Sequence, residues 1–254
     1  MTAAGEPLKI LGTLRSCFRE KFGTPRQPHL VPGATATLTI SRRYQPEQSL
    51  VGLERFSHVW LISYFHLNTN TRFSAKVHPP RLKGETIGLF ASRSPHRPSP
   101  LGLSLARLVK IEGGTLHLAG VDLVDGTPIL DVKPYIPEID SVPGASAGWT
   151  QDAAFPSLEV AFSPQALADI EAAEKRLKTV GLKQLLADIL SQDPRNPRDK
   201  SQLKDGVDLG FFLHDFDAHF AVRDGVATVL ELQTGGAMHK KERREPPKRV
   251  ALSR

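Results

Sequence analysis

The sequence contains a single cysteine, Cys17, among 254 residues. One cysteine excludes an internal disulfide and argues against a zinc site built from thiolates. Such a low cysteine content is typical of proteins in a reducing compartment, and we expect a cytoplasmic protein. The N-terminus lacks a basic region followed by an apolar one, and no run approaches the ~18 apolar residues of a membrane span. We therefore expect neither a signal peptide nor a membrane anchor.

Familiar motifs for nucleotide and metal chemistry are also absent. The chain has no G-x-G-x-x-G after a strand, no G-x-x-x-x-G-K-[ST] and no H-E-x-x-H. Its nine histidines show no metal-ligand spacing. The sequence therefore argues against Rossmann-type, P-loop and zinc chemistry, and we expect no bound metal.

Positive charge is unevenly distributed. The formal net charge is +6, but residues 238–254 alone hold seven Lys/Arg and two Glu. Residues 1–237 hold 26 Lys/Arg against 25 Asp/Glu. Any RNA-binding surface on the body must therefore come from local clusters rather than from overall charge. We expect the basic tail, residues 234–254, to be disordered.

The first part of the chain is predicted to be mainly β. Short runs with alternating apolar residues lie between turns that contain Gly, Pro and Asp. The EGG at 112–114 joins two such runs as a hairpin. Many short strands without helices between them favour a barrel or a sandwich. The predicted strands are 8–14, 35–40, 58–65, 86–91, 103–111, 115–124 and 128–135.

A smaller α+β domain is predicted at 157–233. Residues 141–156, rich in Ser, Pro, Gly and Ala, form the expected linker. Ser163-Pro164 is typical of a helix start, and the helical pattern continues to 180, breaks at Gly181 and resumes over 182–192. A polar loop (193–206) then precedes three strands, predicted over 207–216, 218–224 and 226–232.

Two clusters combine stiff or aromatic residues with polar ones. KFGTPRQPHLVPG (21–33) is held by three prolines and presents Arg26, Gln27 and His29. It is either a surface connection or the rim of a ligand site. FSHVWLISYFHL (56–67) is a core-type strand that ends at Phe65 and His66, and these two residues could form a pocket wall.

Two further clusters carry charge. RSPHRPSPLG (93–102) follows a strand-like run and presents Arg93 and Arg97 on a proline-restricted backbone, as an anion site or as a PxxP-type partner ligand. In DVKPY, Asp131 and Lys133 lie two apart, so on a strand they share a face and can pair, with Tyr135 on the same face. A carboxylate, an ammonium and a phenol on one face favour a site.

The four clusters occur in a consistent order within longer motifs. The motifs are PRQP (25–28), GLERFSHVWLI (52–62), HPPRLKGETIGLFASRSPHRPSPLGLS (78–104) and DLVDGTPILDVKPY (122–135). Together they resemble the TsaA-like family, also called TrmO, over residues 8–140. QDPR (192–195) and LHDF (213–216) resemble the extra C-terminal domain of bacterial members.

The resemblance implies a β-barrel enzyme over 1–140. Members of that family are S-adenosylmethionine-dependent methyltransferases that act on N6 of threonylcarbamoyl-adenosine at position 37 of tRNA, next to the anticodon. They form homodimers with the cofactor near the subunit interface. The implied cofactor contacts are Gln27, Pro28, His29, Phe65, His66, Arg93, Leu103, Asp122, Leu123, Val124 and Asp125.

One residue departs from the family pattern, and the chemistry of the reaction suggests further candidate residues. Ser99 stands where members of that family more often carry Asn, and it lacks the adjacent donor and acceptor of the Asn side-chain amide. Asp131 is our candidate to accept or orient the N6 proton, with Lys133 and Tyr135 holding nearby oxygens. Candidates to bind the threonyl carboxylate are Arg26, Arg97 and Lys133. The alternative is a non-catalytic S-adenosylmethionine- or RNA-binding module on the same barrel.

Overall fold

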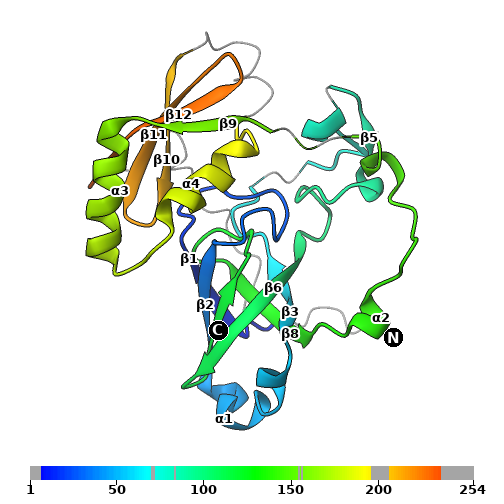
Figure 1. Ribbon diagram of the computed structural model, residues 1–254. Coiled ribbons are helices and arrows are strands. Elements are labelled where there is room, and N and C mark those ends of the chain that lie inside the picture. Colours follow the sequence, from blue (N-terminus) through cyan, green and yellow to red (C-terminus); the bar gives the residue numbers. More distant parts are fainter. Residues whose placement is uncertain are drawn as a thin grey trace.

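The computed structural model describes residues 7–69, 72–82, 84–153, 155, 157–195 and 206–235 (Figure 1). The predictions of a loop at 193–206 and of a disordered tail at 234–254 fall mostly on residues outside these ranges. Among the described residues, no helix has the length and apolar character to cross a membrane. In the same ranges, no three His, Cys, Asp or Glu side chains are grouped so that they could hold a metal ion.

A closed six-stranded barrel forms the N-terminal part, with neighbouring strands in the order β1-β2-β7-β6-β3-β8. Every neighbouring pair is antiparallel. This confirms the mainly β class and the predicted barrel, and closure removes free sheet edges. The strands are β1 (Gly12–Ser16), β2 (Thr35–Ile40), β3 (His58–Tyr64), β6 (Leu101–Glu112), β7 (Thr115–Ala119) and β8 (Pro128–Pro134).

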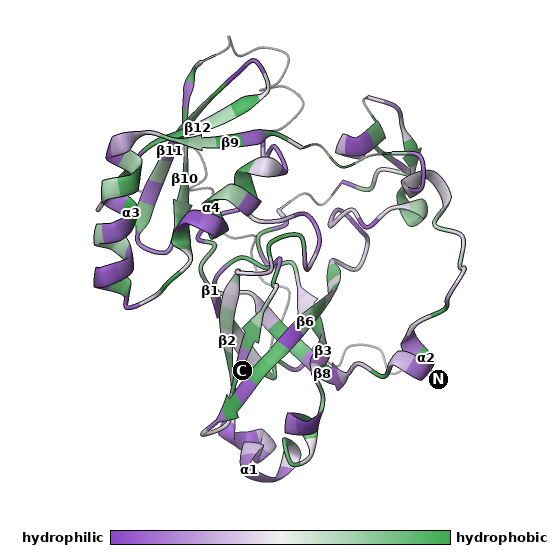
Figure 2. Cartoon of the chain, viewed as in Figure 1, coloured by the Kyte–Doolittle hydropathy of each residue, from purple (hydrophilic) through white to green (hydrophobic). Residues whose placement is uncertain are grey.

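The barrel interior follows the alternation of the strands. In β3, Val59, Leu61 and Ser63 are buried and their neighbours are half-buried. Figure 2 shows hydrophobic residues along the barrel strands and hydrophilic ones around α1 (Pro46–Ser49) at one barrel end. The β6–β7 hairpin turns at the predicted EGG, where Gly113 has a φ of +55° and Gly114 a φ of +80°.

The prediction of a core strand over 86–91 was wrong. Only Ile87–Gly88 is extended, as β5, and it pairs with β4 (Lys76–Val77) outside the barrel. Both lie in a long excursion between β3 and β6, which we call the arm (residues 67–100). β3 already pairs with β6 and β8, so the barrel has no position for another strand there.

Short helical segments complete the N-terminal part. They are η1 (Arg42–Tyr44), η2 (Leu53–Arg55), η3 (Pro80–Leu82), η4 (Leu89–Ala91), α2 (Pro137–Asp140) and η5 (Gly148–Thr150). The predicted strand over 115–124 ends at Ala119, because the chain turns at Gly120 with a φ of +71°. The predicted strand over 8–14 begins only at Gly12 and continues to Ser16.

The C-terminal part is the predicted combination of helices and strands. A four-stranded sheet has the order β10-β11-β12-β9, with β9 parallel to β12. The predicted helix start is correct, since Ser163 Oγ accepts from Ala166 N at 2.9 Å. The predicted strand over 207–216 was wrong at its end, because the chain turns at His214, with a φ of +53°. The elements are β9 (Glu159–Phe162), α3 (Pro164–Leu177), α4 (Leu182–Ser191), β10 (Asp208–Leu213), β11 (Phe216–Arg223) and β12 (Val226–Thr234).

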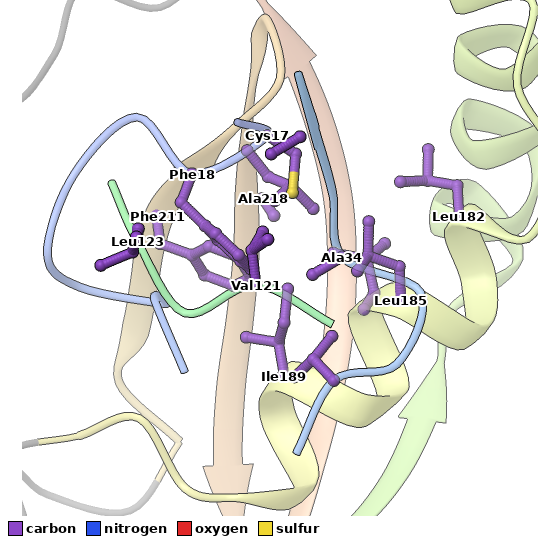
Figure 3. Packing of buried hydrophobic residues seen from close by; sticks show 14 of the residues in the cluster. Cys17, Phe18, Ala34, Val121, Leu123, Leu182, Leu185, Ile189, Phe211 and Ala218 are labelled. Carbon is purple, nitrogen blue, oxygen red and sulfur yellow. The ribbon is translucent and has the colours of Figure 1, made fainter. Parts of the chain in front are cut away.

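One hydrophobic cluster joins the barrel to the C-terminal sheet and helices. Phe18 and Leu213 form an isolated β-bridge, and His214 N donates to Cys17 O at 2.7 Å. The two parts therefore share a core and a backbone connection. Figure 3 shows, from the barrel side, Cys17, Phe18, Ala34, Val121 and Leu123, and from the C-terminal side Leu182, Leu185, Ile189, Phe211 and Ala218.

The segment predicted as a linker, residues 141–156, is attached to the arm. Trp149 Nε1 donates to Ala91 O at 2.8 Å. Arg81 Nε donates to Ala153 O at 2.7 Å, and the Arg81 guanidinium lies 3.9 Å from the Phe155 ring centroid. The composition of this segment suggested a free linker, but its described residues pack on the arm through these specific contacts.

Candidate active site

Residues from four separate segments meet at one end of the barrel, and we call them the rim cluster (Gln27, Arg93, Ser104 and Asp122). Arg93 Nη1 donates to Gln27 Oε1 at 2.9 Å. Ser104 Oγ donates to Asp122 Oδ1 at 2.6 Å, and the Arg93 charge is near enough to act on the Asp122 carboxyl. Three of the predicted cofactor residues are thus brought together by the fold.

Asp122 has an unusual titration. Burial raises the pKa of its carboxyl to about 6, while the Ser104 hydrogen bond and the positive charge of Arg93 act in the opposite direction. The carboxyl is therefore largely ionised at neutral pH in a poorly solvated position. A carboxylate in this state favours a cationic partner, and its raised pKa is typical of a functional site.

His29 lies beside the rim cluster in a left-handed backbone conformation, with a φ of +65°. Its N–H donates to Gly120 O at 3.1 Å, which ties the first loop, including Pro28, to the end of β7. The His29 and His58 ring centroids are 5.5 Å apart. Partial desolvation and the neighbouring His58 lower the pKa of His29, so its imidazole is neutral at pH 7.

Phe65 and His66 continue from β3 toward the rim. Phe65 N donates to Pro100 O at 2.8 Å, and a Cβ at Gly102 would lie 2.8 Å from Phe65 Cζ. Glycine is required at 102 because the Phe65 ring and the Ser63 hydroxyl occupy this space. Burial, and then the charge of Lys21, lower the pKa of His66. The prediction that these two residues form a pocket wall stays a prediction.

Ser63 Oγ is fully buried and has no hydrogen-bond partner among the described residues. It points into the barrel from β3, opposite Gly102 of β6. A buried hydroxyl without a partner costs free energy, and such atoms often await a ligand or water. Sequence reasoning missed Ser63 and Ser104, although both interrupt apolar inward positions of their strands, and that interruption was a usable signal.

The segment 122–125 is fixed by its neighbours. Ser16 Oγ donates to Leu123 O at 2.8 Å, and Thr127 Oγ1 donates to Val124 O at 2.6 Å. The Asp125 carboxylate turns toward β1, where it accepts from Ser16 N at 3.1 Å at the end of the strand and from Arg19 Nη1 at 2.8 Å just beyond it. Asp125 thus holds this segment against β1, and its side chain has protein partners.

Asp131, Lys133 and Tyr135, which we call the Asp131 cluster, share one outer face of the barrel. Lys133 Nζ lies 3.0 Å from Asp131 Oδ2, which confirms the predicted pairing. Asp131 Oδ1 accepts from Val132 N at 2.9 Å. The Tyr135 ring packs edge-on against Trp60, with centroids 5.9 Å apart. Both oxygens of Asp131 are therefore held in one orientation.

A β-bulge determines where the Asp131 cluster points. The β3–β8 register shifts between Ile62 and Ser63, so that Ser63 pairs with Ile129 and Ile62 pairs with Asp131. Ile129 is fully buried, whereas the Asp131 side chain is 46% exposed. The extra residue in β8 turns Asp131 outward, as bulges commonly do beside active sites.

The other predicted substrate residues hold the backbone. Arg26 Nη2 donates to Asp193 O at 3.3 Å and to Arg195 O at 3.4 Å. Arg97 Nη1 donates to Ser92 O at 2.9 Å. Arg26 therefore connects the first loop to the QDPR motif, and Arg97 stabilises the arm.

Leu103 lies apart from the rim cluster. It is 58% exposed and projects from the outer face of β6, whereas Gly102 and Ser104 on either side of it face inward. The structure therefore does not bring this predicted cofactor residue to the same side of the strand as Asp122.

Comparisons with known proteins agree with this architecture. Residues 13–141 match the family model for the tRNA-methyltransferase O N-terminal domain, and residues 156–235 match the model for the TrmO C-terminal domain. A crystal structure of TrmO from Pseudomonas aeruginosa superposes with a TM-score of 0.75 at 37% identity, covering 90% of this chain and 98% of that chain.

Several curated relatives are similar over different lengths. A tRNA (adenine(37)-N6)-methyltransferase of Escherichia coli (strain K12) is 37% identical over 88% of this chain and 96% of the relative. A putative S-adenosylmethionine-dependent methyltransferase RcsF of Pseudomonas aeruginosa is 41% identical over 89% of this chain and 96% of the relative. The mouse tRNA (adenine(37)-N6)-methyltransferase is 53% identical over 52% of this chain, which spans only 31% of that relative. With both domains matched in order, the chain belongs to the tRNA-methyltransferase O (TrmO) family.

Proposed function

We propose that this chain transfers a methyl group from S-adenosylmethionine to N6 of adenosine 37 in tRNA. The observation that carries the proposal is the convergence of Gln27, Arg93 and Asp122 at the barrel end. The name of the Escherichia coli relative states methylation of N6 of adenine 37 in tRNA, and the name of the RcsF relative states dependence on S-adenosylmethionine. Within it, we propose that the target adenosine carries a threonylcarbamoyl group.

The chemistry of the barrel end fits S-adenosylmethionine, which combines a sulfonium, an ammonium, a carboxylate and a purine. The Asp122 carboxylate suits a cationic group, and Arg93 suits the carboxylate. The Phe65 ring suits the purine or the sulfonium. The buried Ser63 hydroxyl offers a hydrogen bond that no described residue accepts or donates. When bound, S-adenosylmethionine supplies an electrophilic methyl group.

The Asp131 cluster is suited to hold the nucleophile. The N6 lone pair of the substrate is conjugated with the purine and the carbamoyl group, so it reacts poorly until the N6–H is polarised or removed. Asp131 presents a carboxylate held by Lys133 Nζ and by Val132 N. A fixed acceptor in this position orients N6–H or takes its proton. The Tyr135 hydroxyl is available to donate to substrate oxygens.

Lys133 is the best placed of the three predicted anion ligands. Its side chain is 63% exposed and lies beside Asp131. Arg26 and Arg97 already donate to backbone carbonyls of the C-terminal part and of the arm. We therefore assign the threonyl carboxylate to Lys133, and we assign Arg26 and Arg97 to loop support.

We also propose a homodimer, with the outer face of β6 covered by a second copy. Leu101 and Leu103 on this face are 40% and 58% exposed. Covering them removes apolar surface from water, which is the main driving force for association. In such a dimer, the outward-facing Leu103 contacts the cofactor held by the rim cluster of the second copy, because it faces away from the rim cluster of its own copy. In light scattering, Leu103→Asp should yield monomers, whereas the matched control Val51→Asp, at a 79% exposed position outside β6, should not.

The alternative is a binding module without catalysis, and one assay separates the two. The protein is incubated with labelled S-adenosylmethionine and with tRNA that does or does not carry threonylcarbamoyl-adenosine. Label that enters only the modified tRNA supports the full proposal, and label that enters both supports only adenosine 37 methylation. Cofactor binding without labelling of either tRNA favours the module. We also propose that the protein acts in the cytoplasm, where tRNA is used in translation.

A further inference from the structure

The arm concentrates positive charge. Residues 67–100 hold six Lys/Arg and one Glu, whereas the rest of residues 1–237 holds 20 Lys/Arg and 24 Asp/Glu. In Figure 1 the arm stands away from the barrel, near the label of β5. An excess of positive charge within one segment, on a body with more Asp and Glu than Lys and Arg, is the kind of local concentration that an RNA-binding surface requires.

Phe90, on η4 of the arm, is 75% exposed although it is a large apolar side chain. The Arg97 guanidinium lies over its ring, with Cζ 5.4 Å from the centroid. Arg97 is itself fixed, since its Nη1 donates to Leu89 O and Ser92 O. The ring therefore rests on an immobilised cation and exposes most of its surface to solvent.

A second phenylalanine lies close by in the fold of the arm. Phe73 is 61% exposed. Two residues after it, Ala75 O accepts from Leu89 N at 2.9 Å, so the backbone next to Phe73 is hydrogen-bonded to the first residue of η4, which carries Phe90. Two large apolar rings exposed to water beside lysines and arginines cost free energy. Such exposure is typical of a surface that binds a partner.

The arm around Phe90 is fixed by hydrogen bonds to residues outside the arm. Trp149 Nε1 donates to Ala91 O, the residue that follows Phe90. Arg81 donates to Thr150 O and Ala153 O in the same segment, 141–156. Two residues after Ala91, Arg93 joins the rim cluster through Gln27. The ring is therefore positioned relative to the candidate active site before any ligand arrives, which lowers the entropy cost of binding.

We propose that the arm is an RNA-binding element in which the Phe90 ring stacks on an unpaired base and Lys76, which is exposed on β4, contacts the phosphate backbone. The proposal rests on the proposed function, which supplies a tRNA as the partner. Unpaired bases of RNA loops are recognised by stacking on aromatic side chains, and the negative backbone complements the charge of the arm. An acidic protein would also satisfy the charge, and the light-scattering outcome given below separates a protein interface from RNA binding.

The stacking step is tested with Phe90→Ala, Phe90→Tyr and the control Val180→Ala, which truncates an 89% exposed apolar residue between α3 and α4. Binding of fluorescent tRNA without cofactor is followed by anisotropy. We expect Phe90→Ala to weaken binding about 5- to 100-fold, Phe90→Tyr to retain it and Val180→Ala to match the wild type. Cofactor affinity, measured by calorimetry, should be unchanged in all three. A dissociation constant for Phe90→Ala within twofold of the wild type overturns the proposal.

The phosphate step is tested by salt dependence. Lys76→Gln should reduce the slope of log K against log salt by about one contact, and Arg42→Gln, at the barrel end that carries α1, should not. Equal slopes for Lys76→Gln and the wild type contradict the assignment of Lys76.

Two further outcomes separate this proposal from others. If Phe90→Ala yields monomers in light scattering and tRNA affinity is restored at high protein concentration, the ring belongs to a protein interface and the proposal is overturned. If the wild type binds tRNA through Phe90 but never methylates it, the proposed reaction fails while the RNA-binding arm stands.

Discussion

Replacement of Asp122 by Asn should change how stability depends on pH. The folded-state pKa of Asp122 is raised by burial to about 6, from an ordinary value of 3.8. Between these values the folded state binds more protons than the unfolded state, so the contribution of Asp122 to stability falls as pH rises through this window. Asn cannot ionise, and its side-chain oxygen can still accept from Ser104.

The size of the effect follows from the two pKa values. The full difference between the folded and the ordinary pKa of Asp122 corresponds to about 3 kcal/mol in the free energy of unfolding. Integrated between pH 4.5 and pH 7.5, the linkage relation leaves about 2 kcal/mol, because part of the change occurs below pH 4.5. The Asp122 side chain keeps some contact with solvent, which screens the effect, and we expect about 1–2 kcal/mol.

Urea unfolding of both proteins at pH 4.5 and pH 7.5 measures this difference. The free energy of unfolding of the variant, minus that of the wild type, should increase by about 1–2 kcal/mol from the lower to the higher pH. Any constant effect of the amide cancels in this comparison. A difference that stays the same, or that decreases with pH, refutes the account of Asp122 as an ionised, poorly solvated carboxylate. Cofactor affinity should fall in the same variant at pH 7.5.

Three other predictions test separate parts of the structure. Asp131→Asn should lower turnover about 100-fold with cofactor affinity within twofold, and near-normal turnover would remove Asp131 from the reaction. Gly102→Ala should cost ~1–3 kcal/mol in urea unfolding, because its Cβ meets Phe65, whereas Gly88→Ala enters open space and should be neutral. Cys17, whose pKa burial raises to about 12, should resist thiol-disulfide reagents at pH 8 until the protein unfolds, and Cys17→Ser provides the blank.

The barrel could be predicted because its strands carry their own signals, namely alternation along each run and glycine at the turns. The run at 86–91 carries the same signals and is not a barrel strand. What distinguishes it is the pairing of β3 on both edges with β6 and β8, which is a property of the assembled sheet. Local pattern identifies a segment that can be extended, and only the complete set of pairings decides where it lies.

The site shows the same division between local and long-range information. The Asp131–Lys133 pair follows from a spacing of two on a strand, and it was predicted. The bulge that turns this pair outward depends on the register between β3 and β8, and no residue pattern within β8 revealed it. The meeting of Gln27, Arg93 and Asp122 joins distant loops, so the sequence could suggest it only through resemblance to a family.

The C-terminal part supports the site from outside the barrel. Gln192 Nε2 of the QDPR motif donates to Leu30 O at 3.1 Å, and Arg26 donates to the carbonyls of Asp193 and Arg195. The first loop, which supplies Gln27 to the rim cluster, is therefore held by a motif more than 160 residues away. Since the segment 141–156 fixes the arm in a similar way, both loops that flank Asp122 depend on residues outside the barrel. We infer that the C-terminal part supports the candidate site by positioning the first loop, and that the described residues of segment 141–156 do the same for the arm.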